Sequence, residues 1–95
     1  MFIVLLRFSE NKTRASEFKE GHNQWIRKGY EDCVFLMVGS LQPGIGGSVI
    51  THGESRQALE KRVNQHPFVT ENIVRAEILE IEPKKADERL SFLLD

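Results

Sequence analysis

The sequence predicts an α+β fold of the ferredoxin-like type, with the element order β-α-β-β-α-β and a short C-terminal helix. A β-hairpin lies in the middle of the chain: the apolar run from Val34 to Val38 leads into a stretch rich in Pro and Gly, and a second run spans Val49 to Thr51. Two such runs joined by turn residues are typical of a hairpin. One helical pattern and one strand pattern flank the hairpin on each side. This order gives an antiparallel sheet with both helices on one face.

The length and charge of the chain limit its class. Its 95 residues predict a single domain over residues 1–95, and its net charge of −1 gives no electrostatic footprint for nucleic acid or an anionic membrane. The apolar start, Met1 to Leu6, is too short for a signal sequence or a bilayer span. The one cysteine, Cys33, forms no internal disulfide, which suits a reducing compartment. We therefore expect a cytoplasmic protein with no nucleic-acid partner and no membrane partner.

The first strand and helix follow from their patterns. The segment from Phe2 to Phe8 is apolar on both faces, which predicts a central strand that is covered on each side. A helix is expected to begin at Asn11 or Thr13, whose side-chain oxygens can cap its first turn, and to end at Gly29. The apolar stripe of this helix consists of Ala15, Phe18, His22, Trp25 and Ile26.

The second half of the chain repeats this alternation. Ser55 is expected to cap a helix that runs to Gln65, because the residue before Pro67 is pushed out of the helical region. A strand is predicted from Ile73 to Ile81, and a short helix from Ala86 to Leu94.

The second face of the sheet predicts an assembly. Both helices cover one face, yet the first strand is also apolar on its other face. A chain this short buries a modest fraction of its surface, so a second copy would add burial. We expect a homodimer in which two sheets pack face to face.

Four stretches of the chain together suggest a family. They are the opening strand Met1-Phe-Ile-Val-Leu-Leu6, the helical Glu20-Gly-His-Asn-Gln-Trp25, the Gly- and Pro-rich Gly39–Ile50, and Gln65-His-Pro-Phe68. In this order and spacing, the chain resembles the YCII-related (YciI-like) family of small dimeric α/β-barrel proteins over about residues 1 to 83. It departs from the family pattern at Ser40, where Pro is frequent, and at His66, where an acid is usual.

The resemblance implies a limited set of functions. Members look like small-molecule enzymes or ligand-binding domains, and one relative's activity resembles dehydrochlorination of a substituted hydroquinone. The wider superfamily includes muconolactone isomerases and monooxygenases that need no metal or organic cofactor. We accordingly expect no cofactor.

Two histidines are the first candidates for catalysis. His22 titrates near neutral pH, so it can give or take a proton, and a pocket between the first helix and the sheet would place it beside a bound ring. The alternative is a partly buried histidine satisfied by a backbone carbonyl. His66 can pair with His22, or with an acid such as Asp32 or Glu71. Otherwise it is a helix-terminal histidine favoured by the helix dipole.

Five further residues are candidates for substrate binding. Arg7 ends a strand and can hold an anionic group, although a salt bridge is the alternative. Gly39 and Ser40 lie in the connection of the hairpin, where glycine allows close approach of a ligand. Trp25 and Phe68 offer aromatic surface to a ring, and both are also suited to the core.

Metal is not expected, because the three histidines lack helical spacing and no cysteine cluster is present. Two functional hypotheses remain. The first is a cofactor-independent lyase or isomerase that acts on a small cyclic or aromatic organic acid, with His22 as general acid/base and His66 or Asp32 in support. The alternative is a non-catalytic small-molecule-binding or interaction module.

Overall fold

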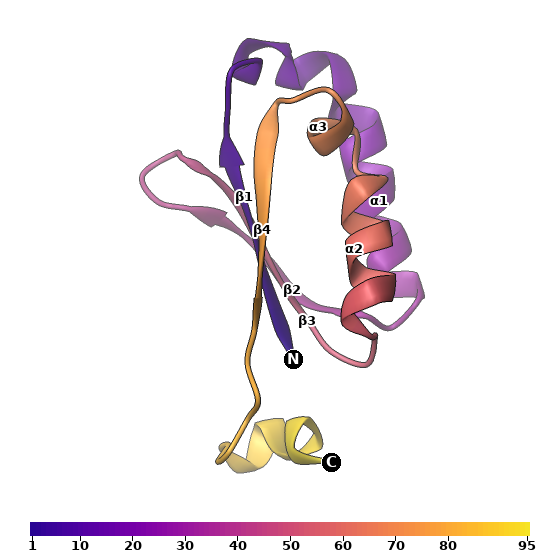
Figure 1. Ribbon diagram of the computed structural model, residues 1–95, viewed down its shortest axis with the longest axis vertical. Helices are drawn as coiled ribbons and strands as arrows, with labels where there is room; N and C mark the ends of the chain where they lie inside the picture. Colours follow the sequence, from indigo (N-terminus) through magenta and orange to yellow (C-terminus); the bar gives the residue numbers. More distant parts are fainter.

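The computed structural model describes every residue from Met1 to Asp95. The strands and α-helices are β1 (Phe2–Phe8), α1 (Lys19–Glu31), β2 (Phe35–Leu41), β3 (Gly46–Thr51), α2 (Arg56–Asn64), α3 (Pro67–Thr70) and β4 (Val74–Glu80). Two 3₁₀ helices, η1 (Lys12–Phe18) and η2 (Glu88–Leu94), precede α1 and follow β4. The predicted element order is confirmed (Figure 1).

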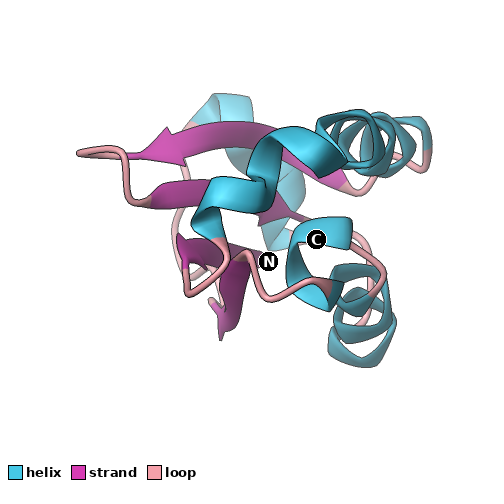
Figure 2. Ribbon diagram, turned by 90° about the horizontal axis from the view of Figure 1, so that it is seen from above, coloured by secondary structure: helices cyan, strands magenta, loops and turns pink.

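The four strands form one antiparallel sheet in the order β2-β3-β1-β4. The first strand is therefore central, as predicted: Phe2 lies opposite Thr51 of β3 and opposite Glu80 of β4. The α-helices lie on one side of this sheet (Figures 1 and 2). The ferredoxin-like α+β class expected from the element order is confirmed.

The core lies between the sheet and the helices. Alternate residues of β1 point to the helices, because successive side chains of a strand face opposite sides. Trp25 of α1 and Leu59 and Val63 of α2 meet them from the helical layer. The sheet contributes buried apolar side chains at Phe2, Val4, Leu6, Phe35, Val49 and Val74.

The other face of the sheet, which we call the open face, is also apolar over much of its area. The strand register aligns Ile3 with Ile50 and with Leu79 on this face. Met37, which lies opposite Ile50, is 52% exposed, and Leu79 is 40% exposed. The open face thus presents large apolar side chains that the helices of the same chain do not cover.

The start of the first helix differs from the prediction. Residues Lys12–Phe18 form the 3₁₀ helix η1, and α1 begins only at Lys19. Asn11 makes no capping hydrogen bond; its side-chain amide donates instead to the carbonyl oxygen of Glu71, at 2.9 Å. The Asn11 side chain therefore makes a tertiary hydrogen bond to the turn before β4 instead of capping the first helix.

The end of this helix also differs, and the reason is packing. Gly29 does not stop α1, which continues to Glu31. Gly29 is instead buried against Phe35, where a Cβ would overlap the ring. The chain reverses at Cys33, whose φ is 59°, and this cysteine is exposed in the turn before β2.

The second helix follows the prediction closely. The Ser55 hydroxyl accepts a hydrogen bond from the Ala58 amide at 3.1 Å, so Ser55 caps α2 as expected. The predicted C-terminal helix appears as the 3₁₀ helix η2, with Leu90 45% exposed and Phe92 packed edge-on against His52 at 5.4 Å between ring centroids. None of the helices is long and apolar enough to cross a membrane.

Candidate functional site

The two catalytic candidates meet. His22 lies in α1 and His66 lies at the start of α3, and His22 Nδ1 and His66 Nε2 are 2.9 Å apart. The helices approach closely because residue 21 is glycine: a Cβ there would lie 3.1 Å from Cγ of Pro67. Pro67 also places His66 in the extended conformation, which makes His66 the N-terminal cap of α3. The sequence-based pairing of His66 with His22 agrees with this geometry.

His66 is fully buried among aromatic rings. Its ring centroid lies 4.4 Å from that of Trp25, 5.0 Å from that of His22 and 5.1 Å from that of Phe68. Burial, and then the nearby His22, lower the pKa of His66 from 6.5 to about 3. The Phe68 amide donates a hydrogen bond to His66 Nδ1 at 2.9 Å. His66 is thus neutral near pH 7, and both of its ring nitrogens have partners.

His22 is half-buried and presents one nitrogen outward. Its ring stacks on Phe68 with centroids 4.6 Å apart and planes within 1° of parallel. Burial lowers the pKa of His22. Its Nε2 has no hydrogen-bond partner within the chain. Only one side-chain nitrogen or oxygen is both fully buried and without a partner, and that atom is Thr51 Oγ1, so Nε2 of His22 is not fully buried. Nε2 of His22 is therefore the one ring nitrogen of the pair that is unpaired and not fully buried.

Trp25 and Phe68 both contact the histidines, but they differ in role. The Trp25 indole N–H donates to the Arg62 carbonyl oxygen at 2.8 Å, and its ring packs on Phe35 at 4.9 Å. Trp25 is therefore a core residue that forms one wall around His66. Phe68 is half-buried and supports the outward-facing His22 from one side.

The hypothesis that Asp32 orients a histidine is wrong. Its carboxylate pairs with Arg62 at 3.1 Å and with Lys28 at 3.3 Å. Burial alone would raise the pKa of Asp32, but the hydrogen bonds from Lys28 and Arg62 outweigh that effect and lower it. Glu71, the other acid considered, pairs with Arg14 at 3.6 Å. Both acids are thus engaged with cations away from the histidine pair.

Three of the proposed binding residues lie elsewhere. Arg7 is on the open face and pairs with Glu77 at 2.7 Å, which is the salt-bridge alternative. Gly39 and Ser40 belong to the edge strand β2, where the Gly39 carbonyl accepts a hydrogen bond from the Ser48 hydroxyl at 3.4 Å. The structure brings none of the three to the histidine pair.

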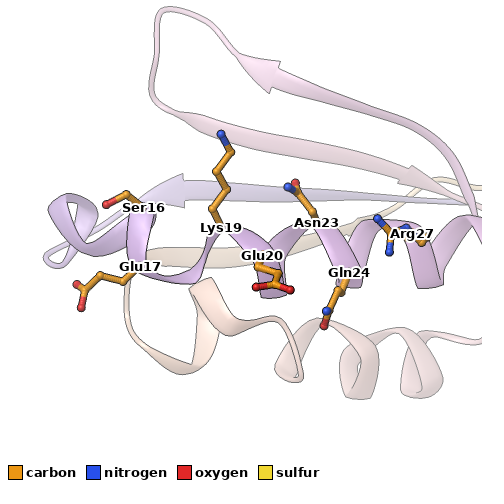
Figure 3. A pocket seen from close by; sticks show the side chains of 7 residues that line it. All are labelled: Ser16, Glu17, Lys19, Glu20, Asn23, Gln24 and Arg27. Carbon is orange, nitrogen blue, oxygen red and sulfur yellow. The ribbon is translucent and has the colours of Figure 1, made fainter.

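The cavities of the chain also avoid the histidines. The largest, about 520 Å³, is lined only by polar residues of η1 and α1, and their side chains fan out from one helical surface without a second wall (Figure 3). A second, of about 490 Å³, lies beside Arg7 and Arg75, and a third, of about 230 Å³, lies between α1 and α2. The expectation of a pocket between the first helix and the sheet is wrong for a single chain, because Trp25 and Phe35 fill that layer.

The sequence did not predict that a main-chain amide would bind one of the histidines. The Phe68 amide fixes one nitrogen of His66, and this contact follows from the capping position before a proline. The His-Pro pair is the signal that could have revealed it, since a polar side chain directly before Pro at a helix start can accept from an amide of the first turn.

Comparison with known proteins supports the fold. No protein-family model and no curated protein matches the sequence. Among solved structures, the chain is similar to TftG, the 5-chloro-2-hydroxyhydroquinone dehydrochlorinase of Burkholderia phenoliruptrix AC1100, in complex with 2,5-dihydroxybenzoquinone. The match has a TM-score of 0.68 at 12% identity and covers 85% of this chain and 93% of TftG. The likeness is therefore one of fold.

Proposed function

We propose that this protein is a cofactor-independent enzyme of the lyase or isomerase type, acting on a small cyclic or aromatic organic acid through His22 as the general acid/base group. The observation that carries the proposal is the histidine pair, in which a buried, neutral His66 holds one nitrogen of His22 while the other is accessible. A positioned group of this kind contributes about 10²- to 10⁴-fold to a rate. Clusters of perturbed titratable groups are typical of functional sites.

The substrate class rests on two further observations. TftG, which shares the fold, carries the name of a dehydrochlorinase and holds a cyclic quinone. In this chain the stacked rings of His22 and Phe68 offer a flat surface beside the accessible nitrogen. We extend the family resemblance in the same way, and propose a single-domain, cytoplasmic member of the YCII-related group.

The assembly we propose is a homodimer through the open face. Apolar side chains at Ile3, Ile50 and Leu79 are aligned across three strands of that face, and Met37 extends the row on the fourth. An apolar surface of this kind is typical of a face that another protein covers. A second copy is the simplest partner, since it buries the same surface on both chains.

Turnover by a histidine variant tests the enzymatic proposal. The protein would be incubated with a panel of cyclic organic acids and chlorinated hydroquinones, and separately with 2,5-dihydroxybenzoquinone, and product formation would be followed by chromatography. His22→Gln is expected to lower turnover about 10²- to 10⁴-fold without unfolding the chain. His52→Gln is the matched control, because His52 packs on Phe92 away from the pair and should leave turnover unchanged.

A second candidate function is a binding or interaction module without turnover. The observation that favours it is the lack of any cavity lined by His22 or His66, since Trp25 and Phe35 fill the layer beneath them. This candidate predicts that ligands of the panel shift the NMR signals of His22 but are recovered unchanged. Equal turnover by the wild-type chain and by His22→Gln would also favour it.

A further inference from the structure

We propose that His22 enters the reaction as a neutral N–H hydrogen-bond donor rather than as a base, so that the site takes a ligand that presents an acceptor oxygen to Nε2 of His22. The acceptor is a carboxylate, phenolate or carbonyl oxygen. The inference rests on the proposed function of this site, and it assigns which ring nitrogen of His66 and of His22 carries the proton. Three steps lead from the main chain to the ligand.

The first step is the Phe68 amide. A backbone N–H can only donate, so His66 Nδ1, which lies 2.9 Å from the Phe68 nitrogen, must carry a lone pair. Nδ1 is the ring nitrogen closer to the backbone, and it is therefore the one that can reach the amide two residues ahead. The fold of the α3 start, with Pro67 at its first position, holds this contact in place.

The second step is the proton of His66. This ring is fully buried and stays neutral near pH 7, so it carries one proton. Since Nδ1 accepts from the amide, the proton must be on Nε2. Nε2 lies 2.9 Å from His22 Nδ1, so His66 donates to His22.

The third step is the proton of His22. Its Nδ1 accepts from His66, so the neutral ring carries its proton on Nε2, the accessible nitrogen. Adding a proton at Nδ1 would place two N–H groups face to face across 2.9 Å. This opposes the imidazolium form in the same direction as burial does, and burial lowers the pKa of His22. The resting site therefore offers a donor to a ligand, and no lone pair.

Neither Asp32 nor Glu71 changes the position of the proton on His22. A carboxylate beside His22 would accept from Nδ1–H and leave a lone pair on Nε2, which is the arrangement of a general base. Here Asp32 is paired with Lys28 and Arg62, and Glu71 with Arg14. The identity of residue 66 thus decides whether His22 gives or takes a proton at Nε2.

The direct test is the tautomer of each histidine, read from long-range ¹H–¹⁵N NMR correlations of the wild-type chain near neutral pH. We expect the proton on Nε2 in both His22 and His66. A proton on Nδ1 of His22 would overturn the inference. The measurement needs no substrate, so it stands apart from the test of turnover.

A matched pair of variants tests the cause. His66→Gln and His66→Glu have similar reach, and both remove the ring nitrogen Nδ1 that accepts from the Phe68 amide. The glutamine amide can still donate to His22 Nδ1, whereas a glutamate carboxylate can only accept. We expect Gln to keep the proton of His22 on Nε2, and Glu to move it to Nδ1 and to raise the pKa of His22. An unchanged tautomer in a folded His66→Glu chain would contradict the inference. Should that variant not fold, the wild-type tautomer decides.

The ligand class is tested with two small probes of similar shape. Benzoate presents acceptor oxygens, whereas benzylammonium can only donate. We expect benzoate to shift the Nε2–H signal of His22 and benzylammonium to leave it unchanged. A preference for benzylammonium, or no response to benzoate, would overturn the ligand class. Turnover by a chain with Nδ1-protonated His22 would overturn this inference and leave the proposed function standing. If the expected tautomer and the benzoate response were found without any turnover, the inference would stand and the proposed enzymatic function would be overturned.

Discussion

Gly29 of α1 lies so close to Phe35 of β2 that a side chain at residue 29 would occupy the space of the phenylalanine ring. The Phe35 ring in turn packs on the Trp25 ring, with centroids 4.9 Å apart, and Trp25 is one of the aromatic residues that surround His66. Because residue 29 has no side chain, α1 can pack closely on β2, and this close packing positions Trp25 against His66.

The first prediction concerns this contact. Gly29→Ala should lower the free energy of unfolding by about 1–3 kcal/mol, because the added carbon overpacks the core. The loss should occur although alanine favours a helix by about 1 kcal/mol over glycine. Urea denaturation followed by circular dichroism measures it. Gly21→Ala is the matched control in the same helix and should stay within about 1 kcal/mol of wild type, since its Cβ would meet only the Pro67 ring edge, at 3.1 Å. A stabilised Gly29→Ala chain would contradict the packing argument.

The second prediction is a pH dependence of stability that comes from His66. Its pKa falls from 6.5 to about 3 on folding, so between these values the unfolded chain binds more protons than the folded one. The contribution of His66 is fully present above pH 6.5 and is lost as the pH falls, at about 1.4 kcal/mol per pH unit. Unfolding free energies of the wild type and of His66→Gln, measured from pH 7 to pH 4, give this slope as their difference. Acids shared by both chains cancel, and parallel profiles would disprove the assignment.

The third prediction concerns Thr51, whose buried hydroxyl has no hydrogen-bond partner. Thr51→Val should raise the free energy of unfolding by about 1 kcal/mol, because it removes an unsatisfied polar group and keeps the shape of the side chain. Thr51→Ser is the control that keeps the hydroxyl but removes a methyl group, and it should cost about 1 kcal/mol. Thermal and urea denaturation of the three chains compare them. If Val proved less stable than Thr, the hydroxyl would have a partner in solution.

The fourth prediction tests the proposed dimer. Leu79→Glu places a charge on the open face and should convert the homodimer into single chains at micromolar concentration, because a buried unpaired carboxylate is costly. Leu90→Glu is the matched control, since Leu90 of η2 is 45% exposed and Leu79 is 40% exposed. Light scattering after size exclusion gives the mass. A wild-type chain that is already monomeric, or a dimeric Leu79→Glu chain, would reject the open face as the interface.

The sequence predicted the fold well because its strands and hairpin follow from local patterns. The run of apolar residues from Phe2 to Phe8 placed β1 at its observed bounds, the predicted strand Ile73–Ile81 placed β4 to within one residue at each end, and Ser55 marked the start of α2. The errors lie where a tertiary contact overrides a local signal. Asn11 gives its amide to Glu71 rather than to a helix start, and Gly29 serves close packing rather than helix termination.

The candidate site was predicted in part for the same reason. His22 and His66 are 44 residues apart in the chain, and their pairing at 2.9 Å depends on the close approach of α1 and α3. The chemistry of the imidazoles can be read from the sequence, but which group each nitrogen meets cannot. Asp32 shows the limit: a carboxylate near the right place in the sequence is held by Arg62, which no spacing rule indicates.

The strand order also has a consequence for how the chain reaches this structure. The first strand, β1, lies between β3 and β4, and its pairing with β4 joins residue 2 to residue 80. A nascent chain therefore leaves one edge of the apolar strand β1 unpaired until β4 has left the ribosome. Folding rates fall as contacts join more distant residues, so we expect the sheet to form in one cooperative event rather than by stepwise growth from the N-terminus. A chain truncated before β4 would leave one edge of β1 unpaired and prone to aggregation.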